Sequence, residues 1–461
     1  MSAIPSSVAQ GSLLTNGIRQ GSDKKMRPVQ IGIIGLGTVG AGTVNVLARN
    51  GDEIARRAGR EVHIALAAVR QVDKPRDCDT QKFQLVTDPM AISNHPDIDV
   101  VIELIGGHEP ARTVVLRAIE NGKQVVTANK ALIAEYGNEI FAAAEQRGVT
   151  VAFEAAVAGG ISIIKAIREG LAGNRIESMA GIINGTANYI LTAMREEQCT
   201  FADKLAQAQR LGYAEADPKF DVEGVDAAHK LTILAAIAFG IPLQFAKVYT
   251  EGISQISLDD ITYAEELGFR IKHLGVTKRT PTGIELRVHP CLLLRRHLLA
   301  HVEGVMNAIY VKGDAAGPTL HYGAGAGAEP TASAVVADIV DVVRTLTIDP
   351  GNRVPHLAFQ RSSITDVPIQ PMSAVTSAYY LRMHAINRPG VLADVTKILG
   401  DLNISIEAIL QKGSGEHESV LPVILLTQQT LESRMNEALE RLAALPTIEG
   451  EISRIRVEQL E

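Results

Sequence analysis

The passage 29–49 constrains the fold most strongly, because a short apolar run there breaks into the glycine sequence GLGTVG and then continues as a helical pattern. Strand, GxGxxG turn and helix follow one another in the order that a dinucleotide-binding unit requires. Such a turn lets the backbone approach a pyrophosphate, which lies at the N-terminus of the helix. We therefore predict a cofactor site made by Gly35, Gly37, Thr38, Val39 and Gly40.

Strand and helix patterns continue to alternate as far as residue 155. The predicted strands after the first are Val62–Val69, Asp99–Leu104, Gln124–Thr127 and Thr150–Phe153, and helices are predicted over Pro110–Asn121 and Ala131–Arg147. This alternation is typical of an α/β fold with a parallel sheet and helices on both faces. We assign residues 27–155 to a Rossmann-type domain that binds NAD or NADP.

The rest of the chain divides into two further units. Residues 156–322 mix helices and strands and predict an α+β substrate and association domain, and the helix that begins near Pro330 should return to the first domain, which residues 323–350 would complete. Residues 355–372 contain three prolines and are assigned to a linker. Residues 373–461 follow the order βαββαβ, which predicts a ferredoxin-like module with a core of its own.

Composition excludes several classes of protein. A net charge of -7 and a pI near 6.0 argue against nucleic-acid and anionic-membrane partners and leave small molecules. The chain has no apolar run of the roughly 18 residues that a membrane span needs. Its three cysteines are widely spaced, which fits a reducing cytoplasm. Residues 1–26 lack a signal-peptide pattern and are predicted to be a disordered tail.

A cluster of acids precedes a strongly apolar helix in the stretch LGYAEADPKFDVEGVDAAHK. The helix is apolar on nearly every face from residue 227 to 239, so its two charged residues, Asp226 and Lys230, should point into the protein. A buried carboxylate and ammonium are costly unless they pair or bind a ligand, which favours a catalytic role. The alternative is an exposed i,i+4 salt bridge, worth only about 0.3 to 0.5 kcal/mol.

Two further signals concern the cofactor. The second strand ends in Val69, Arg70 and Gln71, and Arg70 is suited to the 2'-phosphate of NADP, whereas the nearby Asp73 keeps NAD possible. Lys130 begins a helix, where the helix dipole disfavours a cation, so an anionic or reacting neighbour is expected; a solvated lysine is the alternative. Gly327, in the series GAGAGAEP before the later helix, is a candidate neighbour of the nicotinamide; a flexible connector is the alternative.

The motifs GLGTVG, ELIGG, VVTANKALIA, FEAAVAGGI, NGTANYIL, GYAEADP and DVEGVDAAHK occur in this order. With them, residues 29–345 resemble the homoserine dehydrogenase family, and residues 378–461, with the sequence NRPG, resemble an ACT domain. The resemblance implies NAD(P)H-dependent reduction of L-aspartate 4-semialdehyde to L-homoserine, on the route to threonine, methionine and isoleucine. It also implies feedback regulation by an amino acid and a homodimer or homotetramer.

The resemblance assigns roles to matching residues. Lys230 corresponds to the proton donor and Asp226 to its partner, Lys130 lies near nicotinamide and substrate, and Glu215 and Asp221 hold the substrate. Gly106, in ELIGG, is placed at the cofactor. A monovalent cation such as Na⁺ or K⁺ is implied at Glu154, Val157, Gly159 and Ile161. An amino-acid effector is implied at Asn387 and Gly390.

Two other functions remain open from the sequence. One is another NAD(P)-dependent enzyme of similar build that acts on a different amino acid or aldehyde. The other is a sensor without catalytic activity, although the presence of both Lys130 and Lys230 argues against it. An assay with homoserine and each cofactor separates all three.

Overall fold

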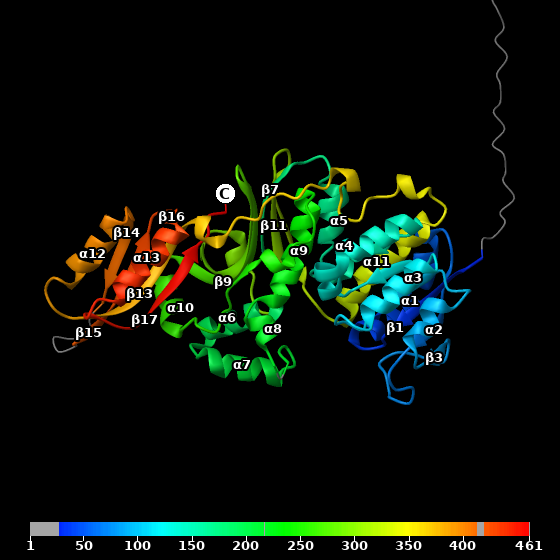
Figure 1. The fold of residues 1–461 in the computed structure, drawn as a ribbon. Coiled ribbons are helices and arrows are strands. Elements are labelled where there is room, and N and C mark those ends of the chain that lie inside the picture. The colour runs from blue at the N-terminus through cyan, green and yellow to red at the C-terminus, as the bar shows by residue number, and fades with distance from the viewer. Residues whose placement is uncertain (1–26, 216, 413–418, 461) are drawn as a thin grey trace, which may run out of the picture.

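The computed structural model describes residues 27–215, 217–412 and 419–460. Three parts follow one another along an elongated molecule (Figure 1). The predicted N-terminal tail lies outside the described residues. Within the described ranges, no helix is long and apolar enough to cross a membrane.

The first part is a six-stranded parallel sheet in the order β3-β2-β1-β4-β5-β6. Its strands are β1 (Val29–Ile34), β2 (Val62–Ala68), β3 (Gln84–Val86), β4 (Val100–Glu103), β5 (Gln124–Thr127) and β6 (Val151–Ala152). The strand order reverses between β1 and β4, and a crevice forms at the carboxyl ends of the strands at such a point. The predicted doubly wound domain is therefore confirmed.

Helices cover both faces of this sheet. They are α1 (Thr38–Ala58), α2 (Pro89–Asn94), α3 (Ala111–Glu120), α4 (Lys130–Arg147) and, from much later in the chain, α11 (Ala328–Thr345). Helix α11 packs beside α1, as Figure 1 shows. A Cβ atom at Gly42 would lie 2.6 Å from the carbonyl oxygen of Ala328, so the two helices touch where only glycine fits. The return of the later helix to the first domain was predicted, whereas β3 and α2 were not.

The middle part combines helices with a large mixed sheet. Its strands are β7 (Ile176–Ile182), β8 (Tyr249–Thr250), β9 (Phe269–Thr280), β10 (Gly283–Leu294), β11 (Met306–Gly313) and β12 (Gly317–Ala324). Its helices are α5 (Ile163–Lys165), α6 (Gly185–Glu197), α7 (Phe201–Arg210), α8 (Lys219–Val222), α9 (Val225–Phe239) and α10 (Leu258–Glu266). An α+β unit was predicted, but the strands β7, β9 and β12 were not.

Helix α9 is the centre of the molecule. Every residue from Asp226 to Phe239 is buried, because the helix packs between the sheet strands β9 and β10 on one side and α4 of the first domain on the other. It ends at Gly240, whose positive φ of 64° gives the left-handed cap that glycine adopts most easily. The prediction of a helix buried on all sides is confirmed, and the exposed salt bridge is excluded.

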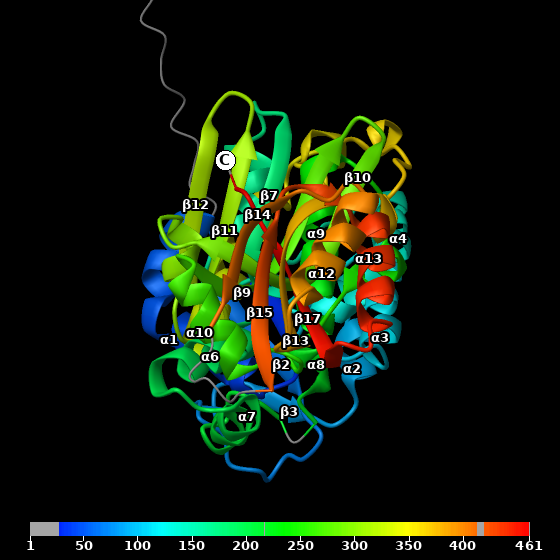
Figure 2. The ribbon, with the colours of Figure 1, turned by 90° about the vertical axis from the view of Figure 1, so that its left-hand side faces the viewer.

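The C-terminal part has the predicted βαββαβ order. Its elements are β13 (Thr376–Ile386), α12 (Val391–Asp401), β14 (Ile406–Gln411), β15 (Val420–Thr427), β16 (Thr430–Leu431), α13 (Glu432–Ala443) and β17 (Ile448–Val457). Both helices cover the same face of its sheet (Figure 2). The other face packs on α6 and α10 of the middle part, with Tyr380 fully buried between them.

One feature of this part was not predicted. Strand β17 pairs in parallel with β10, so the two sheets form one eleven-stranded sheet. Nine of its strands follow the order β12-β11-β7-β9-β10-β17-β13-β15-β14, and the short strands β8 and β16 pair with β10 and β13. The segment predicted to be a linker also packs on the middle part, where the Ile284 N–H donates to the Pro368 carbonyl at 2.9 Å. The C-terminal module is thus joined to the middle part by shared strands and a shared core.

Candidate active site

The GLGTVG turn has the shape needed to receive a pyrophosphate. Gly35 has a positive φ of 100°, and a Cβ atom at Gly40 would lie only 2.1 Å from the Gly35 carbonyl oxygen. A Cβ at Gly37 would meet nothing within 4 Å, so the space above the turn is open. Helix α1 has no side-chain cap, which leaves the N–H groups of its first turn, with Thr38 and Val39, available to an anion.

Arg70, predicted to bind the cofactor, follows the carboxyl end of β2. It is exposed just past the end of β2 and forms no ion pair with any residue that the structure describes. Arg76, in contrast, donates hydrogen bonds to the carbonyls of Gln71, Val72 and Lys74 and so holds its own loop together. Arg70 is therefore the available guanidinium at this edge of the sheet.

A buried carboxylate organises the carboxyl ends of β4 and β5. Glu103 is fully buried and accepts hydrogen bonds from the Thr127 hydroxyl at 2.6 Å and from the backbone N–H groups of Ile105 and Gly106 at 2.9 and 3.2 Å. Burial raises the pKa of this carboxyl. Asn129 caps α4 and donates to the Gly107 carbonyl at 2.7 Å. These bonds fix the ELIGG loop beside the first residue of α4.

That first residue, Lys130, reaches across to the middle part. Its Nζ forms an ion pair with Asp226 Oδ1 at 2.5 Å, and Lys230 Nζ donates to Asp226 Oδ2 at 2.7 Å and to the Ile183 carbonyl at 2.7 Å. Asp226 is therefore shared by two lysines from different parts of the chain. The structure brings the three predicted catalytic residues together, and Lys130 is half-buried and paired, so the solvated alternative is wrong.

The charges in this cluster shift one another's ionisation. Burial lowers the pKa of Lys230, and the Lys130 charge lowers it further against the opposing effect of Asp226. Burial alone would raise the pKa of Asp226, but the two ammonium groups hold it well below its usual range. Burial opposes ionisation of Lys130 too, yet Asp226 raises its pKa. The site thus holds a carboxylate that stays ionised beside a lysine, Lys230, that releases its proton more readily than usual.

Asn184 completes the cluster and was not predicted from the sequence. Its Nδ2 donates to Asp221 Oδ1 at 2.7 Å and to Asp226 Oδ2 at 2.8 Å, while its Oδ1 accepts the Ala187 N–H and caps α6. Burial and the charge of Asp226 raise the pKa of Asp221. The NGTANYIL motif entered the sequence analysis only through the family resemblance, and no local pattern indicates that its first residue both caps α6 and bridges two acids.

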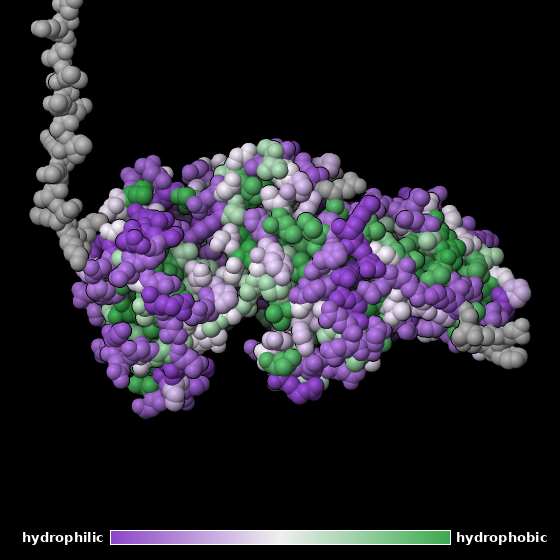
Figure 3. All heavy atoms as spheres, turned by 180° about the vertical axis from the view of Figure 1, so that it is seen from behind, coloured by the Kyte–Doolittle hydropathy of each residue, from purple (hydrophilic) through white to green (hydrophobic). Residues whose placement is uncertain are grey.

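A cavity of about 470 Å³ opens between the first and middle parts beside Lys130. Figure 3 shows from behind the notch that separates these two parts. The first part lines the cavity with Gly106, Gly107, His108, Ala128, Asn129, Lys130, Ala131 and Glu135. The middle part lines it with Phe220, Val225, His229 and Phe245. The predicted cofactor residue Gly106 therefore lies at the same opening as Lys130.

A second contact crosses this cleft. Glu135 Oε1, on α4, lies 3.0 Å from His108 Nε2 and 3.1 Å from His229 Nε2 on α9. The His229 ring stacks on Phe245 at a centroid distance of 4.2 Å, and burial lowers its pKa. Together with the Lys130 and Asp226 pair, this contact fixes the distance between α4 and α9.

Glu215, predicted to bind substrate, is exposed between α7 and α8. Its backbone carbonyl accepts a hydrogen bond from Gln209 Nε2 at 3.1 Å. Its charge and that of Asp221 both raise the pKa of Lys130. The structure therefore places Asp221 in the bonded cluster and Glu215 at its rim.

The predicted cation segment begins at Glu154, which is buried and hydrogen-bonded on both sides. The Glu154 carboxylate accepts the N–H groups of Ile164 and Lys165, each at 2.9 Å, and its own N–H donates to Asp338 at 2.8 Å. Burial raises the pKa of Glu154 to about 7 and that of Asp338 to about 6. In the described part of the chain, no three His, Cys, Asp or Glu side chains gather as a metal site.

The glycine series before α11 is bound to this cation segment. The N–H groups of Gly159 and Gly160 donate to the carbonyls of Gly325 and Ala324, each at 2.9 Å. Gly327 has a φ of 132° and begins α11 without a side-chain cap. This pairing brings the start of α11 next to the predicted cation residues Val157, Gly159 and Ile161.

The predicted effector turn lies far from the cleft, in the C-terminal module. The Asn387 N–H donates to the Ser419 carbonyl at 2.8 Å, and Gly390, with a φ of 93°, begins α12 without a side-chain cap. In Figure 1, α12 stands at the opposite end of the molecule from the dinucleotide-binding part.

Comparison with known families matches all three parts. Residues 35–154 match the NAD binding domain of homoserine dehydrogenase, residues 163–340 match the homoserine dehydrogenase family and residues 379–444 match the ACT domain. A homoserine dehydrogenase of Pseudomonas aeruginosa is 62% identical over 94% of this chain and all of its own length. One from Neisseria gonorrhoeae is 54% identical over 94% of this chain and all of its own length.

Solved structures agree with these matches. A homoserine dehydrogenase from Thiobacillus denitrificans superposes with a TM-score of 0.90 at 61% identity, over 94% of this chain and 98% of that one. One from Staphylococcus aureus gives a TM-score of 0.74 at 31% identity, over 94% of this chain and all of that one. A hyperthermophilic archaeal homoserine dehydrogenase mutant in complex with NADPH gives a TM-score of 0.59 at 25% identity, over 68% of this chain and 97% of that one.

Proposed function

The chain belongs to the homoserine dehydrogenase family, and on this premise we propose that Lys130 and Lys230, held on the two oxygens of Asp226, carry its reaction. The chain is an NAD(P)-dependent oxidoreductase that interconverts L-homoserine and L-aspartate 4-semialdehyde. The observation that carries the assignment of roles is the sharing of Asp226 by two lysines beside the cleft.

Lys230 is proposed as the group that exchanges a proton with the substrate oxygen. An ammonium has three donors, and two of those on Lys230 are occupied by Asp226 and the Ile183 carbonyl, which leaves one for a substrate. The lowered pKa helps Lys230 to donate its proton when the aldehyde is reduced. It also makes the neutral amine more available to accept the proton of the hydroxyl group when homoserine is oxidised. A bound nicotinamide would supply or accept the hydride at the carbon that carries this substrate oxygen.

The other groups are proposed to orient and stabilise. Lys130 keeps a positive charge beside the oxygen on which negative charge develops, since its pKa is raised. Asp226, held ionised, fixes both lysines. Asp221 and Glu215 would accept the ammonium of the substrate, and Asn184 keeps Asp221 and Asp226 together against their mutual repulsion.

The test is a measurement of nicotinamide absorbance with L-homoserine and either NAD⁺ or NADP⁺, on the wild type and on Asp226→Asn. Homoserine-dependent reduction by the wild type and a large loss of turnover in the variant are expected. Equal turnover in both proteins would contradict the proposed roles.

We propose NADP as the preferred cofactor. The support is Arg70, exposed and without an ion pair among the described residues at the end of β2, where the 2'-phosphate would lie. The residues of the turn fit the rest of the dinucleotide, because Gly37 leaves space and the start of α1 leaves N–H donors. The archaeal relative solved with NADPH adds support from the family.

We propose a monovalent cation, K⁺ or Na⁺, at the segment Glu154 to Ile161. Its carbonyl oxygens are hard donors that such an ion prefers. Glu154 and Asp338 are buried near each other with raised pKa values, so a nearby positive charge would favour their ionised forms. The carbonyls of Val157, Gly159 and Ile161 and the Glu154 side chain would hold the ion.

We propose that the ACT module takes an amino-acid effector at the Asn387 to Gly390 turn, where the uncapped start of α12 offers N–H donors to a carboxylate. L-Threonine is the first probe, with methionine, isoleucine and lysine beside it. Full-length enzyme should be used, because removal of residues 373–461 would expose the core around Tyr380 and leave Asp260 without its partner Arg382. Inhibition by none of the four would contradict the proposal.

We propose a homodimer or homotetramer in a reducing cytoplasm. The support for an oligomer is a set of exposed large apolar side chains in the middle part, Leu294, Leu298, Val305 and Tyr322, and the support for a reducing compartment is three free cysteines. Sedimentation analysis should give two or four copies, and a monomer at micromolar concentration would contradict it.

A further inference from the structure

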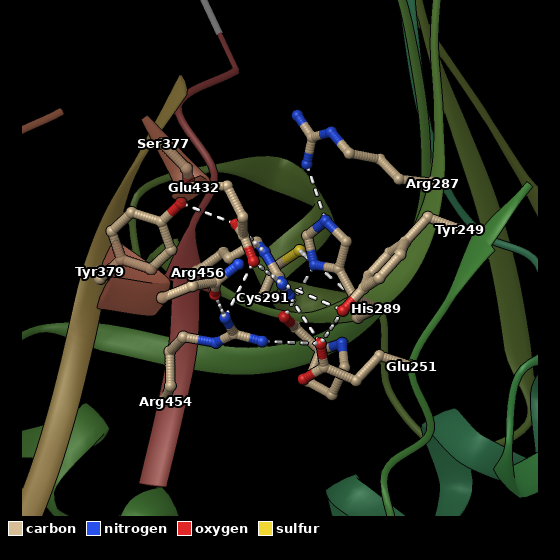
Figure 4. Close-up of polar contacts among 12 residues, drawn as sticks. Tyr249, Glu251, Arg287, His289, Cys291, Ser377, Tyr379, Glu432, Arg454 and Arg456 are labelled. Carbon is tan, nitrogen blue, oxygen red and sulfur yellow. Dashed lines mark hydrogen bonds and ion pairs between the residues drawn. The ribbon is translucent and has the colours of Figure 1, made fainter. Parts of the chain in front are cut away.

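The strongest polar cluster outside the cleft lies where the ACT module meets the middle part (Figure 4). At its centre is Arg456, in β17, which has no exposed surface. Its Nε donates to Glu432 Oε2 at 2.9 Å within the module, and its Nη1 donates to Glu251 Oε2 at 2.8 Å in the middle part. The Tyr249 hydroxyl also donates to Glu251 at 2.8 Å.

Arg456 is fixed in this position. The carboxylates and the Tyr249 ring, whose centroid is 5.2 Å from the guanidinium carbon, surround it, and they raise its pKa against the effect of burial. A guanidinium can donate to several groups in one plane, whereas an ammonium acts as a point charge. Replacing the arginine with lysine would keep the charge and lose most of the geometry.

The segment after Glu251 lies directly on the turn that leads into α9. A Cβ atom at Gly252 would lie 2.6 Å from the Val222 carbonyl oxygen and 2.8 Å from the Glu223 Cα. The Ile253 N–H donates to that same Val222 carbonyl at 2.9 Å. No spare space separates the two segments, so a shift of Glu251 moves the turn.

A second contact, through His273, also connects Glu251 to this turn. His273 Nε2 lies 3.0 Å from the Glu251 carbonyl oxygen, and a Cβ atom at Gly224 would be 3.2 Å from the same imidazole. Gly224 has a φ of 86° and is the residue before α9. Asp221 lies just before this turn and Asp226 just after it, so both acids of the cleft depend on where the turn sits.

We propose that Arg456 is a positioning residue for the reaction, which acts through Glu251 on the turn that carries Asp221 and Asp226. The ACT module thereby holds part of the active site in place even without an effector. This inference rests on the proposed roles of those two acids. It makes the module a working part of the catalytic unit.

The molecule contains a matched control. Arg382, also in the module, pairs with the fully buried Asp260 of the middle part at 2.7 Å. Asp260 belongs to α10, which supplies none of the cleft side chains. Both arginines join the same two parts through a carboxylate of the middle part, the half-buried Glu251 for Arg456 and the buried Asp260 for Arg382, but only Glu251 lies against the turn before α9.

The experiment compares Arg456→Lys and Glu251→Gln with Arg382→Lys in the full-length enzyme, by homoserine oxidation kinetics below each protein's melting temperature. The Arg456 and Glu251 variants should lose about 2- to 30-fold in kcat/KM for homoserine, with the KM for NADP⁺ unchanged. Arg382→Lys should lose melting temperature and keep kcat/KM. Equal losses in all three, or none in the first two, would overturn the proposal.

A second measurement keeps the test readable if Arg456→Lys does not fold. Tyr249→Phe removes one hydroxyl from Glu251, and amide hydrogen exchange of residues 221–228 should be faster in it and in Glu251→Gln than in the wild type. Unchanged exchange in both would overturn the proposal. If Asp226→Asn has wild-type kinetics, the proposed function fails instead, and the exchange result still reports on the contact.

Discussion

Lys130 Nζ lies 2.5 Å from Asp226 Oδ1, and this ion pair joins the dinucleotide-binding domain to helix α9 of the middle part. The same carboxylate holds Lys230 through its other oxygen. A single anion thus sets the distance between two cations that would otherwise repel each other. The proton affinity of Lys230 depends on both neighbours, and a charge change at Lys130 should therefore be visible in the pH profile.

Replacing Lys130 with glutamine removes a cation that lowers the pKa of Lys230. In the proposed mechanism, oxidation of homoserine needs neutral Lys230, so its rate should rise with pH through the pKa of this lysine, which lies below the ordinary 10.5. Lys130→Gln should move this rising limb to higher pH. The measurement is kcat for oxidation across the alkaline range, with Lys219→Gln, an exposed lysine on α8, as control. If the rising limb stays at the same pH, the charge of Lys130 does not lower the pKa of Lys230, which contradicts the prediction.

Arg70→Ala should weaken NADP⁺ more than NAD⁺, because only NADP⁺ carries the 2'-phosphate. A lost charge-assisted hydrogen bond is worth about 1.5 to 3 kcal/mol, or roughly 10- to 150-fold in the ratio of the two binding constants. Titration with each cofactor measures it. Arg76→Ala is the control, since that side chain holds its own loop and should affect both cofactors alike. If Arg70→Ala weakens the binding of both cofactors equally, Arg70 contacts the adenine or has a structural role and does not bind the 2'-phosphate.

Asn184→Asp should keep the helix cap and lose the bridge. Aspartate caps helices as well as asparagine does, but it cannot donate to Asp221 and Asp226. Three carboxylates would then face one another, and kcat/KM for homoserine should fall by about 10- to 150-fold. Steady-state kinetics measure the loss, and a melting temperature near that of the wild type shows that the cap remains. Wild-type kcat/KM would remove Asn184 from the site.

The cation proposal predicts a pH-dependent effect on stability. Glu154 and Asp338 have pKa values raised from 4.5 to about 7 and from 3.8 to about 6, so the folded state binds more protons than the unfolded chain between these values. Stability in tetramethylammonium chloride should therefore fall as the pH rises from about 4 to 7. In KCl the fall should be smaller, because a bound cation stabilises the ionised carboxylates.

Melting temperatures in the two salts across this range provide the measurement. Glu154→Gln should reduce the difference between KCl and tetramethylammonium chloride, since it removes one of the two charges. Identical curves in both salts would contradict the cation site.

Local patterns predicted the elements that obey a simple period. The glycine turn, five of the six strands of the parallel sheet and the apolar α9 follow from local patterns, and α9 led directly to Asp226 and Lys230. Strand β9 was not predicted because its sequence, FRIKHLGVTKRT, carries charged residues at positions that are buried in the structure. Lys272 is only 1% exposed, and it donates to the Val302 carbonyl at 2.6 Å and pairs with Glu303, partners that only the folded chain brings near.

The position of the ACT module against the middle part was not predicted, for a related reason. Its βαββαβ order is a local property and was predicted, but the parallel pairing of β10 with β17 involves only Cys291 with Arg456 and Leu292 with Val457. Periodicity states which face of a strand is apolar and does not state which edges meet. The double role of Asn184 likewise depends on the approach of α6 to α9.

The most direct test of the account is the turnover of Lys230→Ala in homoserine oxidation at saturating homoserine and NADP⁺, beside a titration of NADP⁺ binding. Removal of a positioned proton-transfer group should lower kcat by about 100- to 10,000-fold, while NADP⁺ binding changes little, since the contact acts mainly in the transition state. Near-normal kcat in a folded variant would contradict the assignment of Lys230, and with it the catalytic role of the carboxylate that Lys130 and Lys230 share.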